Sequence, residues 1–248
     1  MIKLAYIPST QSRLLLTALV TFLFCAPLHS EDYQFKLVEW IEADAGGQTL
    51  HKGETHRGVP LLRGQSANLG RGSRMELVGS LGEMVRLGDE TSFTLLHDRQ
   101  VRLSRGEMLL CLPPSKSIPL RIQGPSTSFH LDNSGTVVTQ VTANGGMKLV
   151  CLSGHPRLLV GAHSAVLQPG RVYFLPPGQP RLGRNILIDL SLFIRTSALI
   201  QEFPGKLPTH RQMQKTAFMQ AISIEKRTRL FVGDATSSDS LDLLLIEN

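Results

Sequence analysis

The sequence has few aromatic residues and few long apolar runs, and both shortages exclude classes of protein. Only 6% of the 248 residues are aromatic, and there is one tryptophan, Trp40. A single apolar run, Leu14–Phe24, exceeds about ten residues, which excludes a protein with several membrane spans of about 20 residues each. Three cysteines are too few for a small disulfide-rich fold. A persistent Gly triplet or heptad is also missing, which excludes collagen and coiled coil.

Short catalytic motifs are missing as well. The chain contains no G-x-x-x-x-G-K-[ST], G-x-S-x-G, H-E-x-x-H or C-x-x-C. The pairs His97–Asp98 and His130/Asp132 have residue types suited to acid–base work, but no nucleophile or oxyanion signal accompanies them. His51 and His56 lie in a polar loop, which favours solvent exposure over a metal site. We therefore expect a protein that is not an enzyme and uses no metal or cofactor.

The first thirty residues indicate export. Lys3 and Arg13 precede the run Leu14–Phe24, and Ser30 stands before an acidic pair, which is the pattern of a secretory signal peptide. We expect residues 1–30 to be removed, leaving a chain in the periplasm or outside the cell. The alternative is an uncleaved membrane anchor. The mature chain would carry 24 basic and 20 acidic side chains, a mild excess that permits an anionic envelope polymer as partner and does not require nucleic acid.

An alternating pattern between residues 59 and 175 predicts the fold class. About twelve short segments have apolar residues at every second position, as in Phe93/Leu95 and Leu120/Ile122, which is the period of a strand with one buried face. Gly, Pro and Asn separate these segments at turns. We therefore predict an all-β domain over residues 31–180. A β-solenoid-like arrangement and a sandwich or jelly roll both fit this pattern.

A helical extension is predicted over residues 181–248. Asp189 is a suitable cap for a helix over Leu190–Phe203, and Thr209-x-x-Gln212 is a capping box for a second helix over about His210–Thr228. The second helix has an apolar stripe that we expect to dock on the β-domain. That stripe consists of Met213, Ala217, Phe218, Ala221 and Ile222.

Two groups of residues are candidates for structure or binding. Cys111 and Cys151 could form a disulfide in an oxidising compartment, or could be two small buried side chains. Four cations each stand between two apolar residues of a predicted strand and would form one outer ladder if the strands stacked in register. Such a ladder would attract an acidic envelope protein or an anionic polymer, although a simple solvated face is the alternative. The four cations are Arg86, Arg102, Arg121 and Lys148.

The order of the strands and turns resembles the FecR domain family. The resemblance covers about Leu61–Val172. It rests on the segments Leu62–Gln65, Ser73–Leu77, Gly82–Gly88, Thr91–Phe93 and Val101–Met108, and on two later ones, Leu149–Gly154 and Leu167–Arg171. It implies an all-β, solenoid-like extracytoplasmic module for protein contact or sensing, with no catalytic residues.

The sequence departs from that family in two places. Gly124 is followed by Pro125–Phe129 where the family has a Gly-Thr-x-Phe element, so the match is looser there. Only about 12 residues precede the apolar run, so we expect no cytoplasmic sigma-regulating segment. A membrane-anchored signalling component of FecR type remains the alternative if the N-terminal run is retained.

Overall fold

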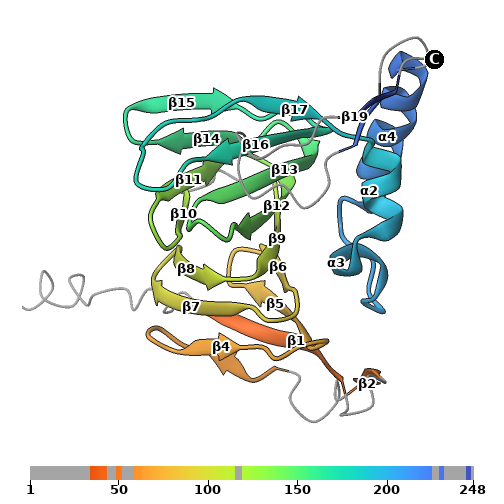
Figure 1. Cartoon of the computed structure of the whole chain (residues 1–248). Coiled ribbons are helices and arrows are strands. Elements are labelled where there is room, and N and C mark those ends of the chain that lie inside the picture. The colour runs from red at the N-terminus through yellow and green to blue at the C-terminus, as the bar shows by residue number, and fades with distance from the viewer. Residues whose placement is uncertain are drawn as a thin grey trace, which may run out of the picture. The chain divides into compact units, whose positions relative to one another are not determined.

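Most of the chain forms short strands that pair into two large sheets (Figure 1). The computed structural model describes residues 34–43, 49–51, 58–114, 119–224, 229–231 and 244–246. The ten-stranded sheet runs β17 (Asn185–Leu187), β16 (Arg171–Leu175), β13 (Met147–Gly154), β12 (Gly135–Val141), β9 (Glu107–Leu112), β6 (Met84–Leu87), β5 (Arg74–Gly79), β1 (Phe35–Ala43) and β2 (Thr49–His51), with β3 (Pro60–Leu61) also on β1. The seven-stranded sheet runs β15 (His163–Val166), β14 (Arg157–Val160), β11 (Ser128–Asp132), β10 (Leu120–Gln123), β8 (Gln100–Arg105), β7 (Ser92–His97) and β4 (Ser66–Asn68).

The many short strands confirm the predicted all-β class. Within the described ranges all pairs are antiparallel except β8 with β10, and each large sheet has free edge strands, so neither closes into a barrel. The two sheets share one apolar core, which is the packing that the sandwich alternative describes. A solenoid-like arrangement is not confirmed.

The shared core follows from the period-two pattern. In the seven-stranded sheet, Phe93, Ile122 and Phe129 point inward and are fully buried, while their sequence neighbours point outward. From the ten-stranded sheet, residues such as Leu77 and Leu149 meet them. Phe35 and Phe93 are in edge-to-face contact across the sheets, with ring centroids 5.9 Å apart.

Three helices near the C-terminus pack against the ten-stranded sheet and bury its second face. They are α2 (Leu190–Thr196), α3 (Ala198–Gln201) and α4 (His210–Ile224). Strand residues such as Leu109 and Val150 join helix residues in a second apolar core. The strands β9, β12 and β13 therefore have buried side chains on both of their faces. Figure 1 shows the helices beside these strands. A short pair, β18 (Arg229–Phe231) with β19 (Leu244–Ile246), follows α4.

The start of the first predicted helix is confirmed, but its length is not. Asp189 caps α2 by accepting a hydrogen bond of 2.9 Å from the Leu192 amide. The helix predicted over Leu190–Phe203 is interrupted at Ser197, whose ψ of 118° is extended. The break lets Leu199 and Ile200 of α3 turn toward the sheet, where both are buried. A cap is a local signal, whereas this interruption depends on tertiary packing.

The predicted docking stripe of α4 is only partly correct. Met213 and Ala217 are buried in the second core, but Phe218 is 66% exposed and Ile222 53% exposed. Gln220 takes the docking role near the end of α4, because its side chain accepts from the Leu190 amide and donates to the Ile188 carbonyl. Of the five residues in the predicted apolar stripe, only Met213 and Ala217 therefore dock on the sheet.

The predicted signal peptide, residues 1–30, lies outside the described residues. Among the helices that the structure describes, none is both long and apolar enough to cross a membrane.

Candidate functional site

A buried arginine joins the ten-stranded sheet to the helices. Arg86 lies opposite Glu76 in the β5–β6 pair and is 0% exposed. Its Nε donates to a Glu76 carboxylate oxygen at 2.7 Å. Charged pairs of this kind are rarely fully buried unless each charge is also satisfied by further hydrogen bonds. The remaining donors of Arg86 therefore have to find acceptors nearby.

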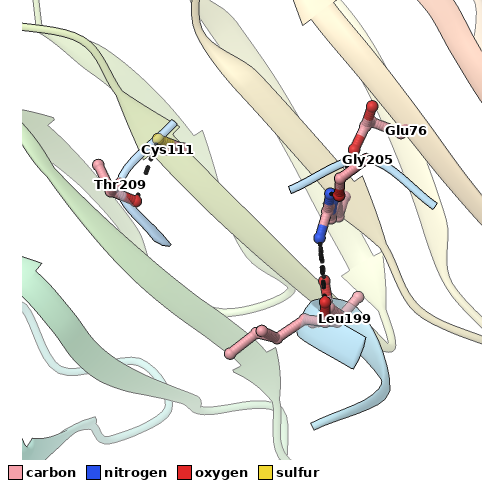
Figure 2. A network of polar contacts seen from close by, with 7 residues as sticks. Glu76, Cys111, Leu199, Gly205 and Thr209 are labelled. Atoms are coloured by element: carbon pink, nitrogen blue, oxygen red, sulfur yellow. Dashed lines mark hydrogen bonds and ion pairs between the residues drawn. The ribbon is translucent and has the colours of Figure 1, made fainter. Parts of the chain in front are cut away.

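Those acceptors come from the helical segment. Arg86 Nη1 donates to the carbonyls of Leu199 at 3.0 Å and Ile200 at 3.5 Å, and Nη2 donates to the carbonyl of Gly205. Phe203 lies 4.5 Å from the guanidinium carbon, ring face toward it, in a cation–π contact. Figure 2 shows Glu76, Leu199 and Gly205 around this network. We call Arg86 and Glu76, with these three carbonyls and Phe203, the arginine anchor.

The electrostatics of the arginine anchor are those of a buried ion pair. Burial lowers the pKa of the Arg86 guanidinium, and the Glu76 carboxylate opposes that shift. An arginine has no acceptor and five donors in a plane, so it suits a site where several carbonyls converge. Because Arg86 has no exposed surface and donates to groups of both the sheet and the helical segment, the anchor holds that segment on the sheet.

Two further contacts fasten the same layer. Arg74 of β5 forms an ion pair of 2.9 Å with Glu202, the residue that ends α3. Thr209, just before α4, has its hydroxyl 2.5 Å from that of Thr136 and 3.6 Å from the Cys111 sulfur (Figure 2). The predicted capping role of the Thr209 side chain is therefore wrong, because its hydroxyl bonds to the sheet and not to its own helix.

The predicted cation ladder is wrong for two of its four members. Arg86 and Lys148 belong to the ten-stranded sheet and point to its helix-covered side, where Arg86 is buried and Lys148 is half-buried. Alternation predicted that these side chains face outward from the shared core, which is correct. It could not reveal that a helical layer covers the outward side, so the four cations form no single surface.

The other two cations do share an open face. Arg102 of β8 and Arg121 of β10 are exposed on the outer side of the seven-stranded sheet. The two strands are direct neighbours: Arg121 lies opposite Gln100, and Arg102 lies opposite Gln123 and donates to its side-chain oxygen at 3.3 Å. The helices cover only the other sheet among the described residues.

His130 and Arg157 extend this face across the next strands. His130 of β11 lies opposite Arg121, and Arg157 of β14 lies opposite Asp132. Partial burial, and secondarily the charge of Arg121, lower the pKa of His130, so its imidazole favours the neutral form near neutral pH. We call Arg102, Arg121, His130 and Arg157 the basic face. It can bind anionic groups on a partner through exposed cations.

The remaining residues of chemical interest are separated. Asp98, the neighbour of His97 in the sequence, forms a solvent-exposed ion pair with Arg63 at 2.8 Å. His51 belongs to β2, but its side chain and the loop with Glu54 and His56 lie outside the described residues. Across the described ranges, no group of three His, Cys, Asp or Glu side chains is arranged to hold a metal ion.

The two cysteines are free thiols in the structure, so the disulfide alternative is not found. Cys111 of β9 belongs to the core under the helices, whereas Cys151 of β13 belongs to the core between the sheets. The strand β12 separates them, which places their backbones roughly 10 Å apart, beyond the reach of a disulfide. Burial raises the pKa of the Cys151 thiol to about 12, which makes it unreactive.

Sequence reasoning missed Glu76 and the three carbonyls of the arginine anchor, those of Leu199, Ile200 and Gly205. A signal for the first was present, because Glu76 and Arg86 each stand between apolar residues on strands joined by a short turn. Opposite charges facing one another on a hairpin are stabilising and can be anticipated. The three carbonyls carry no side-chain signal, since any residue supplies a carbonyl.

Comparisons with known proteins add a fold likeness only. No family model matches the sequence, and no curated protein matches it. Two crystal structures of a protein from Parabacteroides distasonis ATCC 8503, named a "putative anti-sigma factor", are similar to this chain. They share 11% and 10% identity with it at TM-scores of 0.43 and 0.41, and each covers 74% of this chain and 99% of its own. Values this low support no statement about function.

Proposed function

We propose that this protein is an exported, non-enzymatic contact module of the bacterial cell envelope, similar in kind to the FecR domain. The observation that carries the proposal is the difference between the two sheets. Helices cover the outer face of the ten-stranded sheet, whereas the basic face is exposed on neighbouring strands of the other. An open sheet face supported by a buried core is suited to recognition of a partner surface.

The chemistry of the basic face favours an acidic protein surface as partner. Its cations are spread over three strands, β8, β10 and β14, and are not gathered in a pocket, which suits a broad contact. Exposed charge pairs of this kind mainly raise the rate and specificity of association, and salt screens them. The contact is therefore expected to weaken between low and physiological salt. An anionic envelope polymer is the alternative partner.

Charge reversal tests this proposal. The variant Arg102→Glu/Arg121→Glu is expected to lose binding to poly-L-glutamate, used as a defined acidic probe, by at least about tenfold at low salt. Arg195→Glu/Arg211→Glu is the matched control, because it changes the net charge equally and both arginines are exposed on helices α2 and α4 of the other layer. Equal binding by the two variants, or binding that salt does not weaken, contradicts the role of the basic face.

The location is tested separately. Export with cleavage predicts that the protein recovered from the envelope fraction begins at Glu31, as read by N-terminal sequencing. A chain that retains Leu14–Phe24 and sediments with membranes would instead support the second candidate, a membrane-anchored signalling component of FecR type.

A further inference from the structure

The core between the sheets is unfilled at one end, where a cavity of about 400 Å³ opens to solvent. The cavity lies between the β14–β15 hairpin and the segment that leads from β16 to β17. It is lined by Leu158, Val160, His163, Ser164, Ala165, Arg181 and Leu182. Its size falls within the range of roughly 300–1,000 Å³ that small-molecule sites occupy.

The position of the cavity follows from strand register. His163 lies opposite Val160 and Ala165 opposite Leu158, so these four side chains share the inner face of the sheet. Leu158 and Val160 are buried in the shared core, whereas His163 is exposed and Ala165 half-buried. The inner face is therefore continuous from the packed core to the open mouth, and an apolar group entering there would extend the core.

The mouth is polar and carries a cation, Arg181. Arg181 donates from Nε to the Gln179 side chain, an arrangement that orients the guanidinium and leaves its terminal nitrogens for another acceptor. His163 stands on the opposite side, on β15, with its side chain on the inner face. Among the residues that the structure describes, no carboxylate lines the cavity. A negatively charged group placed there would meet donors and no repulsion.

The wall that carries Arg181 is fixed and not a loose loop. Gly161, with φ of 55°, lies so close to Pro180 that an added Cβ would be 2.8 Å from the proline ring. The Gly183 amide donates to the Phe174 carbonyl at 2.7 Å. These contacts hold the segment on both sides of Arg181 and Leu182, so the cavity is formed before any ligand arrives. A preformed site avoids the free-energy cost of ordering.

We propose that this cavity binds a small acyl carboxylate, with the apolar tail on Leu158, Val160 and Leu182 and the carboxylate at Arg181 and His163. The site is distinct from the basic face and does not depend on the proposed contact function. It gives the protein a ligand that inserts between the β14–β15 hairpin and the segment that leads to β17.

Octanoate titrated calorimetrically into the full chain tests the proposal, with octanol and octyltrimethylammonium as probes of the same tail. Saturable binding of octanoate is expected, and binding of the other two at least about tenfold weaker, because only the carboxylate satisfies the donors at the mouth. No saturable octanoate binding overturns the proposal, as does equal binding of all three probes.

Variants locate the site. Ala165→Phe fills the cavity from a half-buried position on an edge strand and is expected to abolish binding. Arg181→Glu is expected to weaken octanoate binding by at least about tenfold. Its matched control is Arg184→Glu, the same change at an exposed position of the same segment that does not line the cavity. Unchanged binding in Arg181→Glu, or an equal loss in Arg184→Glu, overturns the assignment even if Ala165→Phe fails to fold.

Discussion

Arg86 is a charged side chain that is fully buried and paired. It has no exposed surface, and its partners are the Glu76 carboxylate and backbone carbonyls of the helical segment. The sequence context, an arginine between Val85 and Leu87, is the same as that of Arg102 between Val101 and Leu103. The same local pattern therefore gives a buried arginine in one sheet and an exposed arginine in the other. The difference is the helical layer, which of these two strands covers only the one that carries Arg86.

Replacing Arg86 should be far more costly than replacing its exposed counterpart. Arg86→Met leaves Glu76 buried without its partner, and we expect a loss of about 3–5 kcal/mol in the free energy of unfolding. Arg102→Met, at an exposed position with the same flanking residues, should change it by less than about 0.5 kcal/mol. Urea unfolding of both variants measures the difference. Similar losses would contradict the anchor role of Arg86.

The His130 imidazole reports the charge beside it. Removing the neighbouring cation in Arg121→Gln should raise the pKa of His130, though not fully to its ordinary value of 6.5, because partial burial is the larger cause of the shift. Since the pKa is lowered in the folded state, the unfolded chain binds more protons here below pH 6.5, and stability falls as pH falls. An NMR titration of the His130 ring checks this, and no change in the variant would contradict it.

At the scale of elements, the turn from β8 to β9 depends on a glycine for two reasons. Gly106 has φ of 81°, and a Cβ there would lie 2.6 Å from the Thr91 backbone. The Thr91 hydroxyl accepts from the Glu107 amide at 3.1 Å, so the two segments are closely tied. Thr91 is fully buried and cannot move aside without breaking this contact.

A pair of glycine variants separates strain from collision. Gly106→Ala and Gly64→Ala both place alanine at φ of 81°, but the space around Gly64 is open to 4 Å. We expect about 1 kcal/mol of destabilisation at Gly64 from backbone strain alone, and about 1–3 kcal/mol more at Gly106 from the collision. Thermal unfolding compared between the two variants gives the difference. Equal losses would mean that Thr91 moves freely.

Local sequence patterns predicted the strands and the helix starts well, but predicted poorly which faces other parts of the chain would cover. Alternation such as Phe93/Leu95 identified the strands, and Asp189 identified the start of α2, because both effects act within a few residues. The break at Ser197 and the exposed Phe218 were not predictable, since they depend on which helix face meets the sheet. Of the candidate ladder, Arg102 and Arg121 were placed correctly on one face, whereas Arg86 required knowledge of the helical layer.

At the scale of the whole molecule, the two cores lie on opposite sides of one sheet and keep the cysteines apart. Cys151 faces the core between the sheets, and Cys111 faces the core under the helices. Neither core gives a thiol reagent easy access, because both side chains are buried. The oxidising compartment expected from the N-terminal residues does not change this geometry.

Thiol chemistry tests that separation. In the folded protein we expect slow alkylation of Cys111 and Cys151, and after unfolding without reductant both should be alkylated at once. Peptide mass spectrometry reads each position separately. A peptide pair linked through Cys111 and Cys151 would contradict the arrangement of the two cores.

A sheet buried on both faces also shapes how the chain can change over generations. In the seven-stranded sheet, a saturation mutagenesis scan read out by abundance should show tolerance at every second residue, as at Arg121 between Leu120 and Ile122. Along Glu107–Leu112 we expect no such alternation of tolerant and intolerant positions, because five successive residues after Glu107 are buried. New sequence variation, and with it new partners, would then accumulate on one side of the molecule only.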